Sequence, residues 1–340
     1  MASDDIHLSW AHGTFTVVRA GAMCAPAEFL LPDGRRVQPF AVADWQDDGT
    51  QDFRNLPPLL KRLRGDWACV PFGMPNTRVD LPTEWAPRAT ACLAIGNCFH
   101  GPGANEDWTV TETGAGSVTL MLDYPIDHPI SRVKRRIHGD PSGARIHFDL
   151  EVLPRESCRL PVGVHPVMRL PEEIGAAKLV IEGANGVFTY PVDAEPNVSQ
   201  LPNGIRFDAL DRARWSDNSE LDLSHHPLPR QTEEIVLVAG VTGRAHLEYE
   251  REGWRVSVIW DPAAFGACNL WISNGGRGFY PWNHRFRGLG IEPVSAPFDL
   301  GVDVAISGGG PLTRAGIPLA VSFVEGQVWR TRHTVEVSAT

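Results

Sequence analysis

The chain has 340 residues, of which 43 % are hydrophobic and 21 % are charged, so it can bury a sizeable core and extensive disorder is excluded. Its net charge of −10 gives it no general attraction for phosphate backbones, and we expect no nucleic-acid partner. No stretch approaches the roughly 18 consecutive apolar residues of a membrane-spanning helix, so we expect no membrane partner either.

The N-terminal sequence MASDDIHLSW contains two acidic residues and lacks the basic and apolar segments of a secretory signal. The six cysteines are scattered and form no CxxC pair, which is typical of free thiols in a reducing compartment. We therefore expect a cytoplasmic protein.

Strand patterns dominate the chain, and helical periodicity is almost absent. The first strand is expected at 7–19, and a short helix within 55–64 is limited by two prolines. A strand at 117–124 precedes a hairpin in which alternating apolar residues at 132–137 and 146–152 flank a turn at 140–143. The basic run Lys134-Arg135-Arg136 lies in this hairpin, and we expect it on a solvated strand face.

A second hairpin is predicted at 245–260, with its turn at 250–253. Further strands are expected at 178–181, 234–238 and 319–323, the last of them after a surface loop at 307–318. The 33 glycines and 28 prolines favour many strands and turns over a helix bundle. We see neither a linker nor a repeat, and we predict one all-β domain over residues 1–340. It would be a large antiparallel β-sandwich with few short helices.

Four stretches place polar side chains beside Gly, Pro or Trp, where strands are expected to end. Arg64 precedes a glycine and can either hold a ligand oxygen or cap a turn. His100 is followed by Gly-Pro-Gly, so the chain bends directly after it. That bend favours a ring exposed to a cleft, and the alternative is a histidine hydrogen-bonded in the core.

Two further polar residues interrupt apolar runs. His165 lies in such a run and precedes a proline that ends strand pairing, so its ring needs a partner or a purpose there. Glu292 stands alone in an apolar strand, where burial would raise its pKa toward the range of a general base. Structural alternatives remain open for both, namely a core histidine and a carboxylate that caps backbone amides.

In this order, four stretches resemble the galactose-mutarotase-like superfamily, which contains aldose 1-epimerases and hexose-6-phosphate epimerases. They are RGDWACVPFG at 64–73, FHGPGANEDW at 99–108, PVGVHPVMRLP at 161–171 and LGIEPV at 289–294. The resemblance spans roughly residues 64–323. It implies a large antiparallel β-sandwich (a supersandwich) with a sugar cleft on one concave sheet, and proton-transfer chemistry that needs no cofactor and no metal.

The resemblance also implies roles for the residues at matching positions. Glu292 would be the base on the anomeric hydroxyl, His165 the acid on the ring oxygen, and His100 a residue that holds the sugar. The ring would open to the free aldehyde, rotate and close on its other face. The family also uses an Asp on the sugar hydroxyls, for which Asp217 and Asp222 are the candidates; we favour Asp222 and add Arg64 as a substrate-binding residue.

Two departures concern the substrate. The phosphate-binding epimerases carry an Arg four residues after the first His, where this chain has Ala104, and typically a Gln just before it, where this chain has Phe99. The resemblance therefore points to a small neutral or uronic-type sugar as the partner of a monomer or homodimer.

The main alternative to an epimerase is a non-catalytic carbohydrate-binding or regulatory protein of the same fold. A metal hydrolase could use His225 and His226 with His128 or His138, but adjacent histidines in a strand point to opposite faces. A polysaccharide lyase or glycoside hydrolase would need paired carboxylates, and the sequence shows no such pair at a readable spacing.

Overall fold

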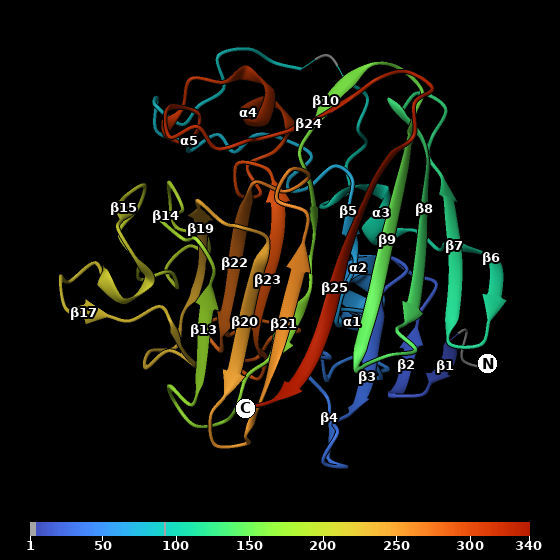
Figure 1. Ribbon diagram of the computed structural model, residues 1–340. Helices are drawn as coiled ribbons and strands as arrows, with labels where there is room; N and C mark the ends of the chain where they lie inside the picture. Colours follow the sequence, from blue (N-terminus) through green and yellow to red (C-terminus); the bar gives the residue numbers. More distant parts are fainter. Residues whose placement is uncertain (1–4, 92) are drawn as a thin grey trace.

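Two large β-sheets dominate the computed structural model, which describes residues 5–91 and 93–340 (Figure 1). Strand pairing within both sheets is antiparallel. The expected all-β fold with few short helices is confirmed, since no helix in the described part of the chain exceeds six residues.

In the described residues, the larger sheet has nine strands in the order β18-β13-β20-β21-β25-β9-β8-β7-β6. Their bounds are β6 (Thr109–Gly114), β7 (Ser117–Asp123), β8 (Ile130–Gly139), β9 (Arg145–Pro154), β13 (Ala177–Ile181), β18 (His225–His226), β20 (Arg244–Tyr249), β21 (Trp254–Trp260) and β25 (Trp329–Ala339).

The second sheet has eight strands within the same described ranges. Its order is β15-β14-β19-β22-β23-β11-β5, and β12 pairs additionally with β23. The bounds are β5 (Ala68–Cys69), β11 (Val162–Val164), β12 (Val167–Arg169), β14 (Gly186–Thr189), β15 (Arg206–Phe207), β19 (Glu233–Ala239), β22 (Ala267–Asn274) and β23 (Arg287–Ser295).

Smaller elements surround the two sheets. One small sheet has the strand order β1-β2-β3-β4, and two further pairs are β10-β24 and β16-β17. Their bounds are β1 (Ile6–Trp10), β2 (Gly13–Val17), β3 (Cys24–Leu30), β4 (Arg36–Val37), β10 (Cys158–Leu160), β24 (Val321–Phe323), β16 (Ala213–Arg214) and β17 (Glu220–Leu221). The helices are α1 (Gln51–Asn55), α2 (Pro58–Lys61), α3 (Gly101–Asn105), α4 (Val302–Ser307), α5 (Pro311–Arg314) and the 3-10 helix η1 (Leu210–Arg212).

The two large sheets pack face to face, as strand alternation dictates. In β22, Leu270 and Ile272 join the same buried cluster as Val256 and Val258 of β21. The intervening side chains of β22, such as Trp271, point to the opposite face and join a second cluster. That opposite face is covered by loops and short helices, and the chemistry-bearing side chains lie there.

Both predicted hairpins are confirmed. Strands β8 and β9 pair across the turn at 140–143, and β20 pairs with β21 through Leu247 opposite Val256. The prediction that the basic run lies on a solvated face is wrong for Arg135. Arg135 is 1 % exposed, because in a strand it shares a face with Val133 and Ile137, both buried, while Lys134 and Arg136 point outward.

Other expectations need correction. The strand expected at 7–19 is a hairpin of β1 and β2, since the chain turns at 11–12. The helix expected within 55–64 divides into α1 and α2 around Pro57. The loop expected at 307–318 contains α5, and the final strand is β25, which runs through the nine-stranded sheet between β21 and β9 (Figure 1). None of the described helices is long and apolar enough to cross a membrane.

Candidate active site

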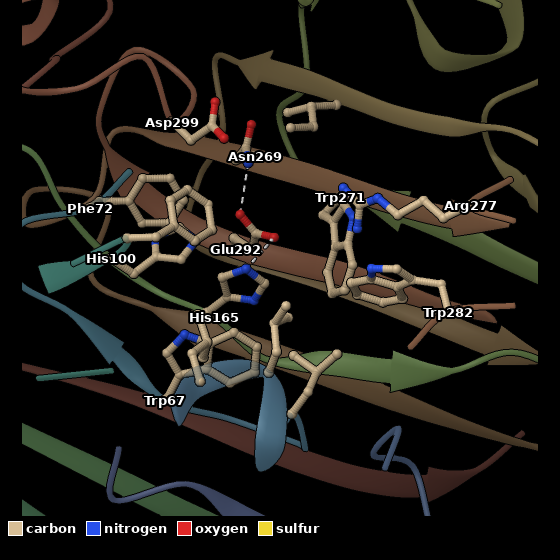
Figure 2. Close-up of a pocket in the computed structure, with 15 residues that line it drawn as sticks. Trp67, Phe72, His100, His165, Asn269, Trp271, Arg277, Trp282, Glu292 and Asp299 are labelled. Atoms are coloured by element: carbon tan, nitrogen blue, oxygen red, sulfur yellow. Dashed lines mark hydrogen bonds and ion pairs between the residues drawn. The ribbon is translucent and has the colours of Figure 1, made fainter. Parts of the chain in front are cut away.

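A cavity of about 100 Å³ lies over β19, β22 and β23, on the face that points away from the nine-stranded sheet (Figure 2). This volume is several times that needed for one water molecule, so a small ligand can enter. Apolar side chains make up most of the wall, and a few polar groups converge inside it. The lining residues are Leu59, Leu60, Leu63, Trp67, Phe72, Phe99, His100, His165, Ile235, Asn269, Trp271, Arg277, Trp282, Glu292 and Asp299.

Glu292 is placed by the register of β22 and β23. In β23, Leu289 and Ile291 face the core between the sheets, so Glu292 faces the cavity. Asn269 of β22 lies directly opposite it, and its Nδ2 donates a 2.7 Å hydrogen bond to Glu292 Oε2. Gly290 leaves the necessary space, because a side chain there would overlap Glu292 Oε1.

His165 lies in the short connection between β11 and β12. Its backbone amide donates to the carbonyl of Trp67 at 2.9 Å, and its ring stacks on the Trp67 indole with centroids 4.1 Å apart. This arrangement brings Nε2 to 3.1 Å from Glu292 Oε1, as Figure 2 shows. Both side chains are buried, and Nδ1 of His165 has no hydrogen-bond partner.

Burial sets the protonation of this pair. Desolvation raises the pKa of Glu292 to about 8, although the hydrogen bond from Asn269 opposes the rise. Desolvation, helped by the neighbouring His100, lowers the pKa of His165 well below its usual value. Near neutral pH these shifts favour a protonated carboxyl beside a neutral imidazole.

His100 begins α3 with a left-handed backbone (φ 60°) and contributes its ring to the same cavity. Its Nδ1 accepts a 3.0 Å hydrogen bond from the backbone amide of Gly73. Burial lowers the pKa of His100 to about 3, so the ring is neutral and its proton resides on Nε2. His100 can thus donate one hydrogen bond to a ligand oxygen. Its ring centroid is 5.2 Å from that of His165.

The structure brings His100, His165 and Glu292 together, but it does not bring Arg64 to the cavity. Arg64 is buried elsewhere, where its guanidinium donates to the carbonyls of Arg62 and Ala25 at 3.3 and 3.2 Å. The turn-capping alternative therefore describes Arg64 better than ligand binding, because its guanidinium is held by two backbone carbonyls away from the cavity.

Asp217 and Asp222 also lie outside the cavity lining. Asp222 accepts from Ser224 and lies 2.8 Å from Nδ1 of His225, and Asp217 pairs with Arg230 at 2.9 Å. Both lie in the segment that runs from β15 to β18. In Figure 1, β15 and β17 of this segment lie at the left, away from β22 and β23. The structure therefore does not bring either residue to the cavity, because local hydrogen bonds hold these loops together.

Another carboxylate, Glu233, lies behind the cavity wall and contacts two of its lining residues, Trp271 and Arg277. Glu233 begins β19 and is 1 % exposed. It accepts hydrogen bonds from Trp271 Nε1 and Ser273, and Arg277 Nη1 lies 3.1 Å away. Burial raises the pKa of Glu233 to about 6. The sequence signal that could have indicated Glu233 is the pair Glu233-Glu234 at the start of an apolar strand.

Sequence reasoning also missed Asn269, Arg277 and Asp299, which line the cavity. Asn269 could have been found only from the pairing of β22 with β23, which the sequence does not display. Among the described residues, no group of three or more His, Cys, Asp or Glu side chains could hold a metal ion.

No protein-family model matches the sequence, and no curated protein matches it. Solved structures do match over nearly the whole chain. An aldose epimerase homologue from Caenorhabditis elegans has a TM-score of 0.63 at 15 % identity, with 100 % of both chains covered. A galactose mutarotase-like protein from Clostridium acetobutylicum has a TM-score of 0.62 at 16 % identity, covering 99 % of this chain and 95 % of that one. A galactose mutarotase-like protein from Lactobacillus casei has a TM-score of 0.61 at 14 % identity, covering 98 % and 99 %.

These likenesses extend over both large sheets and both ends of the chain, whereas the sequence motifs spanned roughly 64–323. At such low identity they establish the fold. The chain has the galactose-mutarotase-like β-sandwich fold.

Proposed function

We propose that this protein is a carbohydrate epimerase of the aldose 1-epimerase type, which interconverts the anomers of a free sugar. The observation that carries the proposal is the buried contact of 3.1 Å between His165 Nε2 and Glu292 Oε1 at a cavity large enough for a small ligand. A carboxyl and an imidazole whose pKa values are shifted by a shared site are suited to general acid–base catalysis.

Anomer exchange requires one proton to leave the anomeric hydroxyl and one to reach the ring oxygen. Glu292 takes the hydroxyl proton while the bond between the anomeric carbon and the ring oxygen breaks and the carbonyl forms. His165 gives its proton to the ring oxygen as that oxygen leaves. The open aldehyde rotates, and the two transfers run in reverse as the ring closes on its other face, so protons and electrons balance.

The reactive state needs Glu292 as carboxylate and His165 as imidazolium. Burial favours the proton on Glu292. Because Nε2 and Oε1 are only 3.1 Å apart, this proton can pass directly between them without help from solvent. We expect the hydroxyls of a bound sugar and the Trp67 ring stacked on His165 to stabilise the resulting ion pair.

A non-catalytic sugar-binding protein is the second candidate, and one observation favours it. The resting pair is neutral, as suits two groups that only hydrogen-bond a ligand. Aromatic walls such as Trp271 and Trp282 would serve a binding protein equally well. The two candidates differ in whether the protein accelerates anomer exchange.

The test is anomer exchange measured by NMR for the wild type and for Glu292→Gln. Glutamine keeps the volume and can still accept from Asn269, but it has no basic oxygen. We expect a loss of about 10²–10⁴ in rate. His165→Asn should lose a similar factor, whereas His100→Asn should weaken binding more than turnover.

A thermal melt accompanies each rate measurement, and Asp222→Asn serves as a matched acid-to-amide control outside the cavity. Wild-type speed in a well-folded Glu292→Gln protein would remove Glu292 from the chemistry. An inactive wild type that still binds sugars would favour the binding protein.

A further inference from the structure

Asp299 is a second carboxylate of the cavity to which no role has been assigned so far. It lies four residues after β23, lines the cavity, and is 7 % exposed. Its Oδ1 accepts a 2.6 Å hydrogen bond from the hydroxyl of Tyr190. Figure 2 shows its carboxyl on the same side of Glu292 as Asn269, opposite His165. One oxygen of Asp299 is thus fixed by the protein, and the other is available inside the cavity.

The backbone around Asp299 is held in a costly conformation. Phe298, directly before it, has φ 52°, which is unfavourable for a bulky residue. The carbonyl of Asp299 accepts a 2.7 Å hydrogen bond from the amide of Met74. Gly73 packs so closely that a side chain there would lie 2.7 Å from the Asp299 backbone. Because the Gly73 amide also donates to His100, one segment fixes both residues.

No basic residue forms an ion pair with Asp299 in the part of the chain that the structure describes. Arg78 lies over the Tyr190 ring, but Asp80 holds it with two hydrogen bonds of 2.9 and 2.7 Å. Arg277 lies at the cavity wall between Glu195 and Glu233, at 2.7 and 3.1 Å. An acceptor that is buried, fixed and without a cation needs donors from a ligand.

We propose that Asp299 is a substrate-binding residue that accepts hydrogen bonds from a sugar hydroxyl other than the anomeric one and selects neutral over anionic sugars. Asp299 would face any phosphate or carboxylate placed beside it, and Glu292 would add a second negative charge in its carboxylate state. The available cations are already neutralised by Asp80, Glu195 and Glu233. A hydroxyl supplies the missing donor without adding charge. The inference rests on the proposed sugar substrate and narrows its class.

The experiment compares wild type with Asp299→Asn, Tyr190→Phe and the control Asp222→Asn. Binding is followed by tryptophan fluorescence, since Trp67, Trp271 and Trp282 line the cavity, and exchange by NMR. The probes are D-glucose and D-galactose as neutral sugars, and glucose 6-phosphate and glucuronate as anions. Asparagine keeps the volume and an acceptor, so folding should survive, and thermal melts check that it does.

We expect Asp299→Asn to raise Kd and KM for the better neutral sugar about tenfold, because a charge-assisted hydrogen bond is lost. Its kcat should change less than about threefold, and the discrimination against the two anions should shrink by about tenfold. Tyr190→Phe should raise Kd in the same direction by a smaller factor, since the carboxylate loses its fixed orientation. Asp222→Asn should match the wild type.

Unchanged Kd and unchanged discrimination in Asp299→Asn would overturn the inference, as would a fall in kcat at constant KM. If Asp299→Asn does not fold, the Kd of Tyr190→Phe decides alone. The fluorescence readout separates this inference from the proposed function. If the wild type binds neutral sugars but does not accelerate anomer exchange, the proposed epimerase activity is contradicted. The Kd of Asp299→Asn compared with that of the wild type still tests the inference.

Discussion

The carboxyl group of Glu292 is buried without a cation, and its protonation therefore affects folding as well as chemistry. Its pKa is about 8 in the folded state, against an ordinary value of 4.5. Between these two values the unfolded chain releases the proton that the folded chain keeps. The folded state binds more protons across this window, so Glu292 makes stability fall as pH rises from about 4.5 to about 8.

Glu292→Gln removes this titration. We predict that the melting temperature of the variant rises relative to that of the wild type as pH increases from 5 to 8. Each pH unit in this window lowers the free energy of unfolding of the wild type by about 1.4 kcal/mol at most. The measurement is a series of thermal melts for both proteins at several pH values. Melting curves that shift in parallel with pH would mean that Glu292 is already ionised in the folded protein.

Gly290 gives a second residue-scale prediction. A methyl group there would overlap Glu292 Oε1, while the backbone around it is ordinary strand. We expect Gly290→Ala to displace the carboxylate and lower kcat about 10- to 100-fold with little change in melting temperature, because misplacement of about 1 Å is costly in catalysis.

Gly288→Ala is the matched control for this change. Gly288 lies two residues earlier in β23, and an added methyl would approach only side-chain atoms of Phe286 and Val167, at 3.0–3.1 Å, which can move. Its kcat should stay within about twofold of wild type. Equal effects of the two substitutions would assign the loss to the strand and not to the carboxylate.

At the scale of elements, a buried ion-pair cluster joins three distant parts of the chain. Arg135 of β8 pairs with Asp66, whose Oδ2 lies 2.8 Å from Nε2 of His333 in β25. Arg135 also donates to the carbonyl of Ala22 at 2.7 Å. Burial lowers the pKa of Arg135 to about 10 and that of His333 well below its usual value, so Arg135 stays charged near neutral pH and His333 is neutral.

We predict that Asp66→Asn destabilises the protein by about 3–5 kcal/mol, because it leaves the buried Arg135 charge unpaired. Asp66 precedes Trp67, on which His165 stacks, so exchange activity should fall as well. Urea unfolding measures the loss. Lys134→Gln, on the outward face of the same strand, is the control and should stay within about 0.5 kcal/mol of wild type. If Asp66→Asn lowers the free energy of unfolding no more than Lys134→Gln does, the cluster does not stabilise the fold.

Local patterns explain which elements could be predicted. The hairpins β8–β9 and β20–β21 combine strict alternation with a short turn, and both signals lie within about 25 residues of chain. Strand β25 carries charged side chains in its first half, which is only partly buried, so apolar and polar residues do not alternate clearly there. Its place between β21 and β9 depends on long-range pairing.

The candidate site was predictable where a residue conflicted with its own surroundings. His165 and Glu292 are polar residues within apolar stretches of the sequence, and that conflict is visible locally. Asn269 and Asp299 belong to the cavity only because β22 pairs with β23 in one register and because the chain reverses at Phe298. Arg64 does not reach the cavity, because nearby backbone carbonyls decide the direction of its long side chain.

At the scale of the whole molecule, layering and charge act together. Packing one face of the eight-stranded sheet against the nine-stranded sheet leaves its other face to hold polar groups at fixed strand positions. The net charge of −10 gives the molecule a negative long-range field that repels anions and leaves neutral sugars unaffected. Ala104 is fully buried and offers no charge to a ligand.

We therefore predict that wild-type protein prefers neutral sugars to their 6-phosphates. The better of D-glucose and D-galactose should exceed its 6-phosphate about tenfold or more in kcat/KM. The reason is that Arg277, the one cationic side chain among the described residues that line the cavity, is already paired with Glu195 and Glu233. Raising the salt concentration to about 0.3 M should narrow this ratio by screening the negative field, while kcat/KM for the neutral sugar stays constant. Anomer exchange by NMR at two salt concentrations measures both. A preference for the 6-phosphate would mean that Arg78 or Arg277 leaves its carboxylate partner to bind phosphate, and Arg78→Gln and Arg277→Gln would then identify which one.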